Sequence, residues 1–342
     1  MSAMPLRSID WMEGKIRIIN QNKLPKALVY EDIESLGGVV EAIKTMKVRG
    51  APLIGVAAAL GLALVAHKNS SLPREELLRR LDENAERLRE TRPTAVNLSW
   101  ALDRILSEAR RSKNPSDTVV EKAVEMMEED VEINEGMATN GLQLIEDGDV
   151  VLTHCNTGSL ATVSVGTALG VILKAHQTGK KIRVFATETR PRMQGARLTM
   201  FELKYEGVDA TLIPDTAVGQ TMKVGGVTKV MVGADRILRD GTTYNKIGTY
   251  QIAVLARHHG IPFYVVAPTS SFDLKSRRED VVIEERSPAE VTKVRGVETA
   301  PEGIKVYNPA FDETNPSLIS AFVTERGLFY PPYGESLQRL LS

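Results

Sequence analysis

The sequence predicts an α/β protein in which a mostly helical N-terminal domain with a small antiparallel hairpin precedes a Rossmann-like, parallel-sheet C-terminal domain. Helical spacing of apolar residues dominates the chain up to residue 146. After Gly148, short runs rich in β-branched residues alternate with helical segments, which is typical of a parallel sheet covered by helices. The pattern changes within residues 112–148, and we place the two domains at residues 1–130 and 131–342.

The N-terminal elements begin with the hairpin. Arg17-Ile18-Ile19 follows the turn residues Glu13-Gly14 within the first 25 residues, which favours two short antiparallel strands. The segment 52–67 is almost wholly apolar and small, so we expect a buried central helix with Pro52 in its first turn. Helical patterns are predicted over residues 33–46, 52–67, 73–90, 95–111 and 116–146.

The C-terminal elements begin with the segment 150–175, which predicts a buried strand, a tight turn and a long helix. A helix that starts just beyond the carboxyl end of a parallel strand suits a phosphate group. Cys155, the single cysteine, lies at this turn and indicates a reaction centre beside an anion site. The tail from Asn308 is rich in Pro, Phe and Tyr and predicts a packed arm. Strands are predicted over 150–154, 182–187, 210–213, 229–232 and 262–266.

Composition excludes several classes of protein. The formal net charge of −1 gives no basic field that would gather nucleic acid or anionic lipid. No run approaches the roughly 20 apolar residues of a membrane span, and the N-terminus lacks an apolar signal core, so we expect a soluble cytoplasmic protein. One cysteine and five scattered histidines offer no disulfide framework and no spacing of metal ligands. We find no phosphate loop and no dinucleotide fingerprint, and we expect neither a metal nor a cofactor.

Polar residues cluster where the predicted strands and helices end. The motifs Arg49-Gly50-Ala51-Pro52, Glu188–Gly195, Gly233–Arg236 and Asn245–Thr249 each adjoin such an end, the last of them opening the helix after the fourth strand. Ligands of open parallel sheets bind beyond the carboxyl ends of the strands. We therefore expect one cleft, faced by Arg49 from the helical part, that contains Cys155, Gln194, Asp235, Asn245 and Lys246.

Each of these residues also has a purely structural interpretation. A lone cysteine is more often a small buried hydrophobe than a catalyst. Asp235 suits a turn or a cap, Arg49 suits a helix junction, and Gln194 suits a loop anchor. His154 adjoins Cys155, but successive strand residues face opposite ways, which disfavours a Cys–His dyad. Together, cations, one carboxylate and one thiol favour isomerisation or elimination on a phosphorylated sugar.

Five motifs carry a family resemblance over essentially the whole chain. RGAPLIG, THCNTGSLAT, ETRPRMQGARLT, GADRI and NKIGTY resemble the methylthioribose-1-phosphate isomerases of methionine salvage. The resemblance implies conversion of 5-methylthioribose 1-phosphate into 5-methylthioribulose 1-phosphate by a homodimer without metal or cofactor. It implies Asp235 as the acid/base and Cys155 as a second catalytic group. The substrate-binding residues that it implies are Arg49, Gly50, Ala51, Arg92, Gln194, Asn245 and Lys246, of which Arg92 comes from the resemblance alone.

Two alternatives remain within the wider superfamily. A ribose-1,5-bisphosphate isomerase needs a second phosphate pocket where a methylthio group needs an apolar recess. A non-enzymatic regulatory subunit, like those of the exchange factor for the second eukaryotic translation initiation factor, has no need to keep Cys155, Asp235 and the cations together. Their joint presence favours catalysis.

Overall fold

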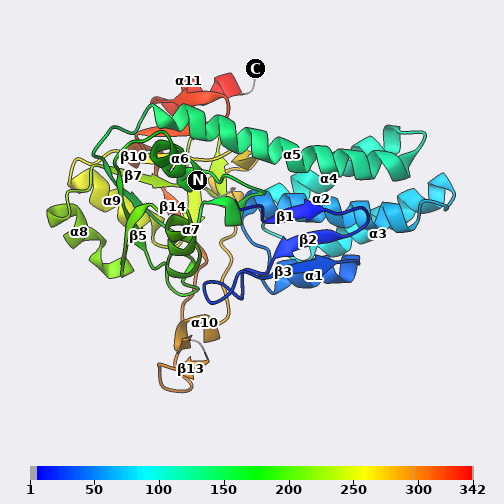
Figure 1. Cartoon of the computed structure of the whole chain (residues 1–342), viewed down its shortest axis with the longest axis horizontal. Helices are drawn as coiled ribbons and strands as arrows, with labels where there is room; N and C mark the ends of the chain where they lie inside the picture. The colour runs from blue at the N-terminus through cyan, green and yellow to red at the C-terminus, as the bar shows by residue number, and fades with distance from the viewer. Residues whose placement is uncertain (1–5, 295, 341–342) are drawn as a thin grey trace.

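A bundle of helices and an open parallel sheet lie side by side in the computed structural model, which describes residues 6–294 and 296–340 (Figure 1). The long helix α5 (Pro115–Leu142) extends across both parts, because it packs on α2 (Ala51–Lys68) in the bundle and on α6 (Ala168–Gln177) beside the sheet. The predicted domain boundary at residue 130 falls inside α5, and the division at that residue stays a prediction.

The predicted hairpin is present and belongs to a sheet of three strands. β1 (Ile9–Trp11) pairs antiparallel with β2 (Ile16–Ile19), and β2 pairs with β3 (Tyr30–Ile33). The predicted helix start at residue 33 is wrong because that residue ends β3. The Ser35 hydroxyl accepts the Gly38 N–H instead and caps α1 from its β-region backbone.

The helical bundle matches its predicted segments apart from a few residues at the ends. Every residue from 53 to 66 of α2 is buried, and the helix packs against α4 and α5. By length and hydropathy α2 could span a membrane, but 78% of it is covered by the protein itself, so its composition is that of a core helix. The other bundle helices are α1 (Leu36–Lys44), α3 (Arg74–Arg89) and α4 (Val96–Arg111).

The main sheet has seven strands in the order β16-β15-β10-β7-β4-β5-β6. All pair in parallel except β16, which confirms the predicted parallel sheet and adds one antiparallel edge. The predicted strands are β4 (Val150–Thr153), β5 (Arg183–Thr187), β6 (Asp209–Ile213), β7 (Lys229–Val232) and β10 (Phe263–Val266). The tail predicted as an arm supplies β15 (Ala321–Thr324) and β16 (Gly327–Phe329).

This strand order places a topological switch point between β4 and β7. From β4 the chain winds outward through β5 and β6, and it then returns to the other side of β4 as β7 and β10. In such doubly wound sheets the carboxyl ends of the two central strands diverge and leave a crevice. Cys155 follows β4 and Asp235 follows β7, so both lie at this crevice.

The long helix predicted to begin after the tight turn that follows Cys155 starts later than expected. A single 3₁₀ turn, η1 (Ser159–Ala161), follows β4, and α6 begins only at residue 168. Val165 and Gly166 both have positive φ, at 64° and 96°, and reverse the chain before α6 starts. A Cβ on Gly166 would lie 2.4 Å from the Cα of Gly158, so only glycine allows this reversal.

A small separate sheet has four strands in the order β11-β8-β9-β14. Asn245 and Lys246 end β9 rather than opening a helix, and α9 (Thr249–His258) starts after Gly248, which has φ of 104°. This corrects the prediction for the segment 245–249. The strands are β8 (Arg236–Leu238), β9 (Thr243–Lys246), β11 (Phe272–Asp273) and β14 (Phe311–Thr314).

A long excursion separates β11 from β14, and we name its first part, residues 275–293, the strap. It contains η5 (Arg278–Asp280) and α10 (Ala289–Thr292), and it leads into the hairpin of β12 (Lys293–Val294) and β13 (Val297–Glu298). Figure 1 shows α10 and β13 extending away from the body of the molecule.

Short elements complete the described chain. They are η2 (Gly195–Thr199, a π-helix), α7 (Met200–Tyr205), η3 (Asp215–Ala217), α8 (Val218–Val224), η4 (Thr269–Ser271), η6 (Pro316–Leu318), α11 (Tyr333–Ser336) and η7 (Leu337–Leu340).

We expect Leu60→Ala to lower the free energy of unfolding by about 2–5 kcal/mol, because Leu60 is fully buried on the all-apolar helix α2 and its loss leaves a cavity. Urea denaturation followed by circular dichroism measures the change. Leu28 is 36% exposed, and Leu28→Ala should cost less than about 0.5 kcal/mol. Equal effects of the two substitutions would contradict a core role for α2.

Candidate active site

One pocket at the switch point brings the sequence-predicted residues together. It encloses about 700 Å³ of empty space, including its open mouth. Its walls come from the N-terminus of α2, the loop before α4, the segments after β4 and β7, the end of β9, and the strap. The predicted residues that line it are Arg49, Gly50, Ala51, Arg92, Cys155, Gln194, Asp235, Asn245 and Lys246.

Cys155 is held at the pocket by its backbone rather than by a basic partner. Its φ of 63° is left-handed, its N–H donates to Thr189 Oγ1 at 2.9 Å, and its carbonyl accepts from Thr199 Oγ1 at 2.6 Å. Burial raises the pKa of the thiol, against the opposing charges of Arg49 and Lys246. The residue therefore presents a neutral, polarisable thiol at neutral pH.

His154 has a structural role. Its Nε2 lies 2.9 Å from the carbonyl oxygen of Ile247, so Nε2 carries the proton and donates it. Nδ1 then accepts from the Thr187 hydroxyl at 2.6 Å, and burial lowers the pKa of the ring. Both ring nitrogens are thus used to join β4, β5 and the residue before Gly248, which agrees with the expectation against a Cys–His dyad.

Asp235 provides the one carboxylate in the wall of the pocket. Its backbone N–H donates to the carbonyl of Tyr244 at 3.0 Å, which fixes the residue at the start of the small sheet. Among the described residues, no side chain forms a hydrogen bond or ion pair with its carboxylate. Burial raises its pKa, and the charge of Lys246 opposes this most strongly. A carboxyl group in this environment can hold a proton near neutral pH.

Arg49 and Gly50 bring the N-terminus of α2 to the pocket. Gly50 is the N-cap with φ of 111°, and a Cβ there would lie 2.4 Å from the carbonyl oxygen of Ala161. No side chain caps the helix, and Ala51 lines the pocket beside Arg49. Because Pro52 has no N–H, the N–H of Ala51 is the first that α2 can offer to a ligand. Within the described chain Arg49 bonds only neutral oxygens, on Gln21 and Asn156, and forms no direct ion pair with a carboxylate. This end of α2 can bind an anion.

The anion site predicted beside Cys155 is filled by the protein's own Glu202. Its carboxylate accepts from Asn156 Nδ2 and Ser159 Oγ, both at 2.6 Å, and from the Leu160 N–H at 3.4 Å. A Cβ on Gly158 would lie 2.3 Å from this carboxylate. Because Asn156 donates to Glu202, its amide oxygen faces Arg49 and accepts from it. Sequence reasoning missed Glu202, which lies three positions after the end of the ETRPRMQGARLT motif.

Lys246 and Arg92 differ in how their charges are compensated. Lys246 is 5% exposed, donates to the carbonyl of Ala310 at 2.7 Å and lies 4.8 Å above the ring of Phe311. It has no ion pair in the described chain. Arg92 pairs with Glu284 at 3.2 Å, while its buried Nε has no partner among the described residues.

Gln194 and Asn245 offer polar groups to a ligand. Both are buried, and the Oε1 atom of Gln194 has no hydrogen-bond partner in the described residues. Asn245 donates to Thr249 Oγ1 at 3.0 Å, which leaves its amide oxygen free for a donor. A hydroxyl of a sugar can satisfy such an acceptor. The pocket therefore combines cations and a helix N-terminus for an anion, acceptors for hydroxyls, one acid and one thiol.

No group of three His, Cys, Asp or Glu side chains within residues 6–294 and 296–340 is arranged to hold a metal ion. The expectation of a reaction without metal or cofactor stays a prediction. Arg286 and Phe311 also line the pocket and were missed by sequence reasoning. Arg286 lies in the charged run EERS, which is typical of a solvated surface.

Comparison with known proteins gives consistent results at full length. The model of the initiation factor 2 subunit family matches residues 47–331. A methylthioribose-1-phosphate isomerase of Thermosipho africanus is 48% identical over 337 residues, which is 97% of each chain. One of Desulforudis audaxviator is 48% identical over 341 residues, which is 98% of each chain.

Solved structures give the same picture. The 5-methylthioribose 1-phosphate isomerase of Pyrococcus horikoshii OT3 is 44% identical with a TM-score of 0.90, over 98% of this chain and 95% of that one. A structure from A. fulgidus described as translation initiation factor eIF-2B, subunit delta, is 47% identical with a TM-score of 0.88, over 98% and 99%.

We expect kcat/KM to fall as the pH rises through about 8. Burial and the nearby charge of Arg286 lower the pKa of Lys246 from 10.5 to about 8, although Cys155 and Asp235 oppose the shift. The side chain is therefore cationic below that pH and neutral above it, when it no longer attracts an anionic ligand. In Lys246→Arg the alkaline limb should move to higher pH, because a guanidinium stays charged. An unchanged limb in Lys246→Arg, together with a moved limb in Cys155→Ser, would assign the titration to the thiol instead.

Proposed function

The chain belongs to the initiation factor 2 subunit family, and we propose that the pocket between β4 and β7 is the active site of its isomerase activity. The protein is a methylthioribose-1-phosphate isomerase of methionine salvage, an aldose–ketose isomerase acting on a small sugar phosphate. What carries the assignment of the site is that one pocket contains an unpaired carboxylate of raised pKa, a neutral thiol and cations without carboxylate partners.

The phosphate of the substrate binds at the N-terminus of α2. Among residues 6–294 and 296–340, Arg49 and Lys246 form no ion pair with a carboxylate, and no side chain caps the N-terminus of α2 at Gly50 and Ala51. Hydrogen bonds from these cations and N–H groups to a phosphate dianion are charge-assisted, and they stabilise the bound substrate. Gln194 and Asn245 then accept or donate at the sugar hydroxyls, and Arg92 completes the binding set.

Asp235 opens the furanose ring. The anomeric oxygen of the substrate carries phosphate, so no free aldehyde exists and the bond between C1 and the ring oxygen must break first. Protonated Asp235 gives its proton to the ring oxygen as that bond breaks, which leaves a hydroxyl on C4 and a carboxylate on Asp235. Burial raises the pKa of Asp235 and so favours its protonated form, and the surrounding cations stabilise the carboxylate that forms.

Hydrogen then moves from C2 to C1, and the hydroxyl on C2 becomes the ketone. In a proton-transfer route a base removes the C2 proton to form an enol, C1 then takes up a proton, and the C2 hydroxyl gives its own proton to the Asp235 carboxylate. In a hydride route the hydrogen moves from C2 to C1 with its electron pair while Asp235 takes the proton from the C2 hydroxyl. Cys155 serves as the second catalytic group in either route, as a proton-transfer partner or by stabilising the electron-poor C1. Substantial solvent deuterium at C1 of the product excludes the hydride route.

An apolar recess beside the pocket suits the methylthio group. Ile54, Val96 and the strap residues 281–283 line it, and it shares Ala51 and Asp235 with the pocket. Its two arginines are already engaged, Arg92 with Glu284 and Arg236 with Asp273 at 3.6 Å. A phosphate on C5 would lose its hydration there without a free cation to replace it. This favours the methylthio sugar over ribose 1,5-bisphosphate.

The remaining expectations are part of the same proposal. We propose a cytoplasmic homodimer with the α/β part as the contact surface, and no nucleic-acid or membrane partner. The family resemblance supports the dimer, and the near-neutral charge of the chain supports the rest.

Asp235→Asn should lower kcat by about 100- to 10,000-fold while substrate still binds, because the amide keeps the shape and cannot transfer the proton. Steady-state kinetics measure kcat, and isothermal titration with substrate measures binding. Cys155→Ser should also lower kcat strongly. Asp209 is exposed on β6, and Asp209→Asn removes the same charge away from the pocket without effect. Wild-type kcat in Asp235→Asn would show that the acid is another group.

Substrate preference tests the apolar recess. We expect ribose 1-phosphate, which has a hydroxyl in place of the methylthio group, to have kcat/KM lower by about 10- to 200-fold. Ribose 1,5-bisphosphate should be slower still, because its second phosphate cannot be desolvated in the recess. Product formation from all three sugars by the same preparation measures this order. Activity on the bisphosphate alone would assign the chain to the other isomerase.

A further inference from the structure

The strap forms a wall of both the pocket and the apolar recess. Arg286 reaches the pocket from it, and residues 281–283 line the recess. The strap follows all five sequence motifs in the chain, and those motifs predict no role for it. Its contacts with the rest of the molecule show how it is held.

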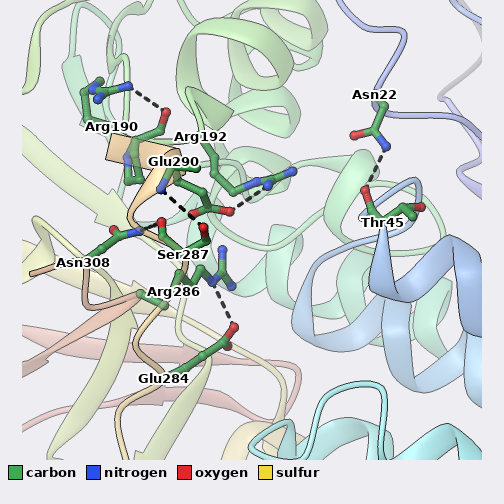
Figure 2. A network of polar contacts seen from close by, with 12 residues as sticks. Asn22, Thr45, Arg190, Arg192, Glu284, Arg286, Ser287, Glu290 and Asn308 are labelled. Atoms are coloured by element: carbon green, nitrogen blue, oxygen red, sulfur yellow. Dashed lines mark hydrogen bonds and ion pairs between the residues drawn. The ribbon is translucent and has the colours of Figure 1, made fainter. Parts of the chain in front are cut away.

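Two arginines of the ETRPRMQG motif anchor the strap rather than face the pocket. Arg190 Nη2 donates to the carbonyl of Val291 at 2.9 Å, and Arg192 forms an ion pair with Glu290 at 2.8 Å (Figure 2). Asn308, on the returning chain, donates to the carbonyl of Ser287 at 3.0 Å. These bonds fix the part of the strap that follows residue 286.

The backbone around Arg286 is fixed as well. Its N–H donates to the carbonyl of Asn308 at 2.9 Å, and the Ala310 N–H donates to the carbonyl of Glu284 at 2.8 Å. The Arg286 side chain is 9% exposed, and its Nε donates to Glu284 at 3.0 Å (Figure 2). Its two terminal nitrogens have no hydrogen bond within the described chain.

The cations at this wall are Arg92, Arg286 and Lys246. The carboxylate of Glu284 forms ion pairs with both Arg92 and Arg286, so these two cations share one negative charge. The guanidinium of Arg286 lies 5.9 Å from the centroid of the Phe311 ring, and the ammonium of Lys246 lies 4.8 Å from the same centroid. Like charges held this way in a buried site repel each other, and an anion between them removes the repulsion.

We propose that Arg286 is a further substrate-binding residue, which the anchored strap delivers to the pocket so that its terminal nitrogens bind the phosphate of the substrate together with Lys246. Glu284 is the positioning residue that orients Arg286 through Nε and leaves the terminal nitrogens to the ligand. The inference rests on the proposed function of the pocket, and it adds a residue to the phosphate site that the motifs do not contain.

The test compares Arg286→Leu and Arg286→Lys with Lys275→Leu, a matched loss of one charge at an exposed position of the same strap. KM for 5-methylthioribose 1-phosphate and the competitive inhibition constant of inorganic phosphate should both rise about 10- to 100-fold in Arg286→Leu, less in Arg286→Lys, and not at all in Lys275→Leu. The value of kcat should change less than KM.

A second measurement tests whether the charge of Arg286 acts on Lys246 in the pocket. Removing the positive charge of Arg286 should raise the pKa of Lys246, so the alkaline limb of kcat/KM in Arg286→Leu moves to higher pH. The moved limb places the charge beside Lys246, and the inhibition constant of inorganic phosphate reports phosphate binding itself. If Arg286→Leu fails to fold, Arg286→Lys reports the same constants.

The outcomes distinguish the inference from the proposed function. An active wild type with unchanged KM, phosphate inhibition constant and pH limb in the Arg286 variants overturns the role of Arg286 alone. A wild type that does not isomerise the sugar overturns the proposed function. In that case thermal stabilisation by inorganic phosphate still tests Arg286, because its loss in Arg286→Leu and not in Lys275→Leu supports an anion site and equal stabilisation refutes it.

Discussion

The buried carboxylate of Glu202 is the interaction on which the geometry of the site depends. It accepts three hydrogen bonds from the loop after β4, and it fixes the amide of Asn156 so that the amide oxygen meets Arg49. Burial raises its pKa, and the donors around it oppose that shift. This carboxylate on α7 thus holds both the segment of Cys155 and the side chain of Arg49, although Glu202 does not itself line the pocket.

The site forms where three parts of the chain meet. The doubly wound sheet supplies the crevice with Cys155 and Asp235 at the ends of its two central strands. The bundle closes one side with the N-terminus of α2, whose 14 buried residues from 53 to 66 hold it rigidly. The strap closes another side with Arg286. The contact of the three parts buries the charged groups of the pocket. This burial raises the pKa of Asp235 and lowers the pKa of Lys246.

The spacing of apolar residues was sufficient to predict most helices and strands, but it failed where the backbone turns sharply. The helices of the bundle and five strands of the main sheet follow from the spacing of apolar residues. The helix expected after Cys155 does not form there because Val165 and Gly166 adopt positive φ, which a pattern of apolar residues does not reveal. Likewise β15, fully buried as AFVT, has the composition of a strand but stands in a tail whose prolines and aromatics obscure it.

The sequence by itself determined the α/β class, the polar residues at the ends of strands and helices, and the family. These properties depend on short-range pattern and on motifs that are contiguous in the chain. The shared cleft was expected from the strand ends, but tertiary contacts were needed to show that Glu202 fills the expected anion site and that Arg286 joins the cations of the pocket. The physical reason is that burial and charge compensation depend on neighbours distant in sequence: Glu284 and Arg92, which share an ion pair, are separated by 192 positions.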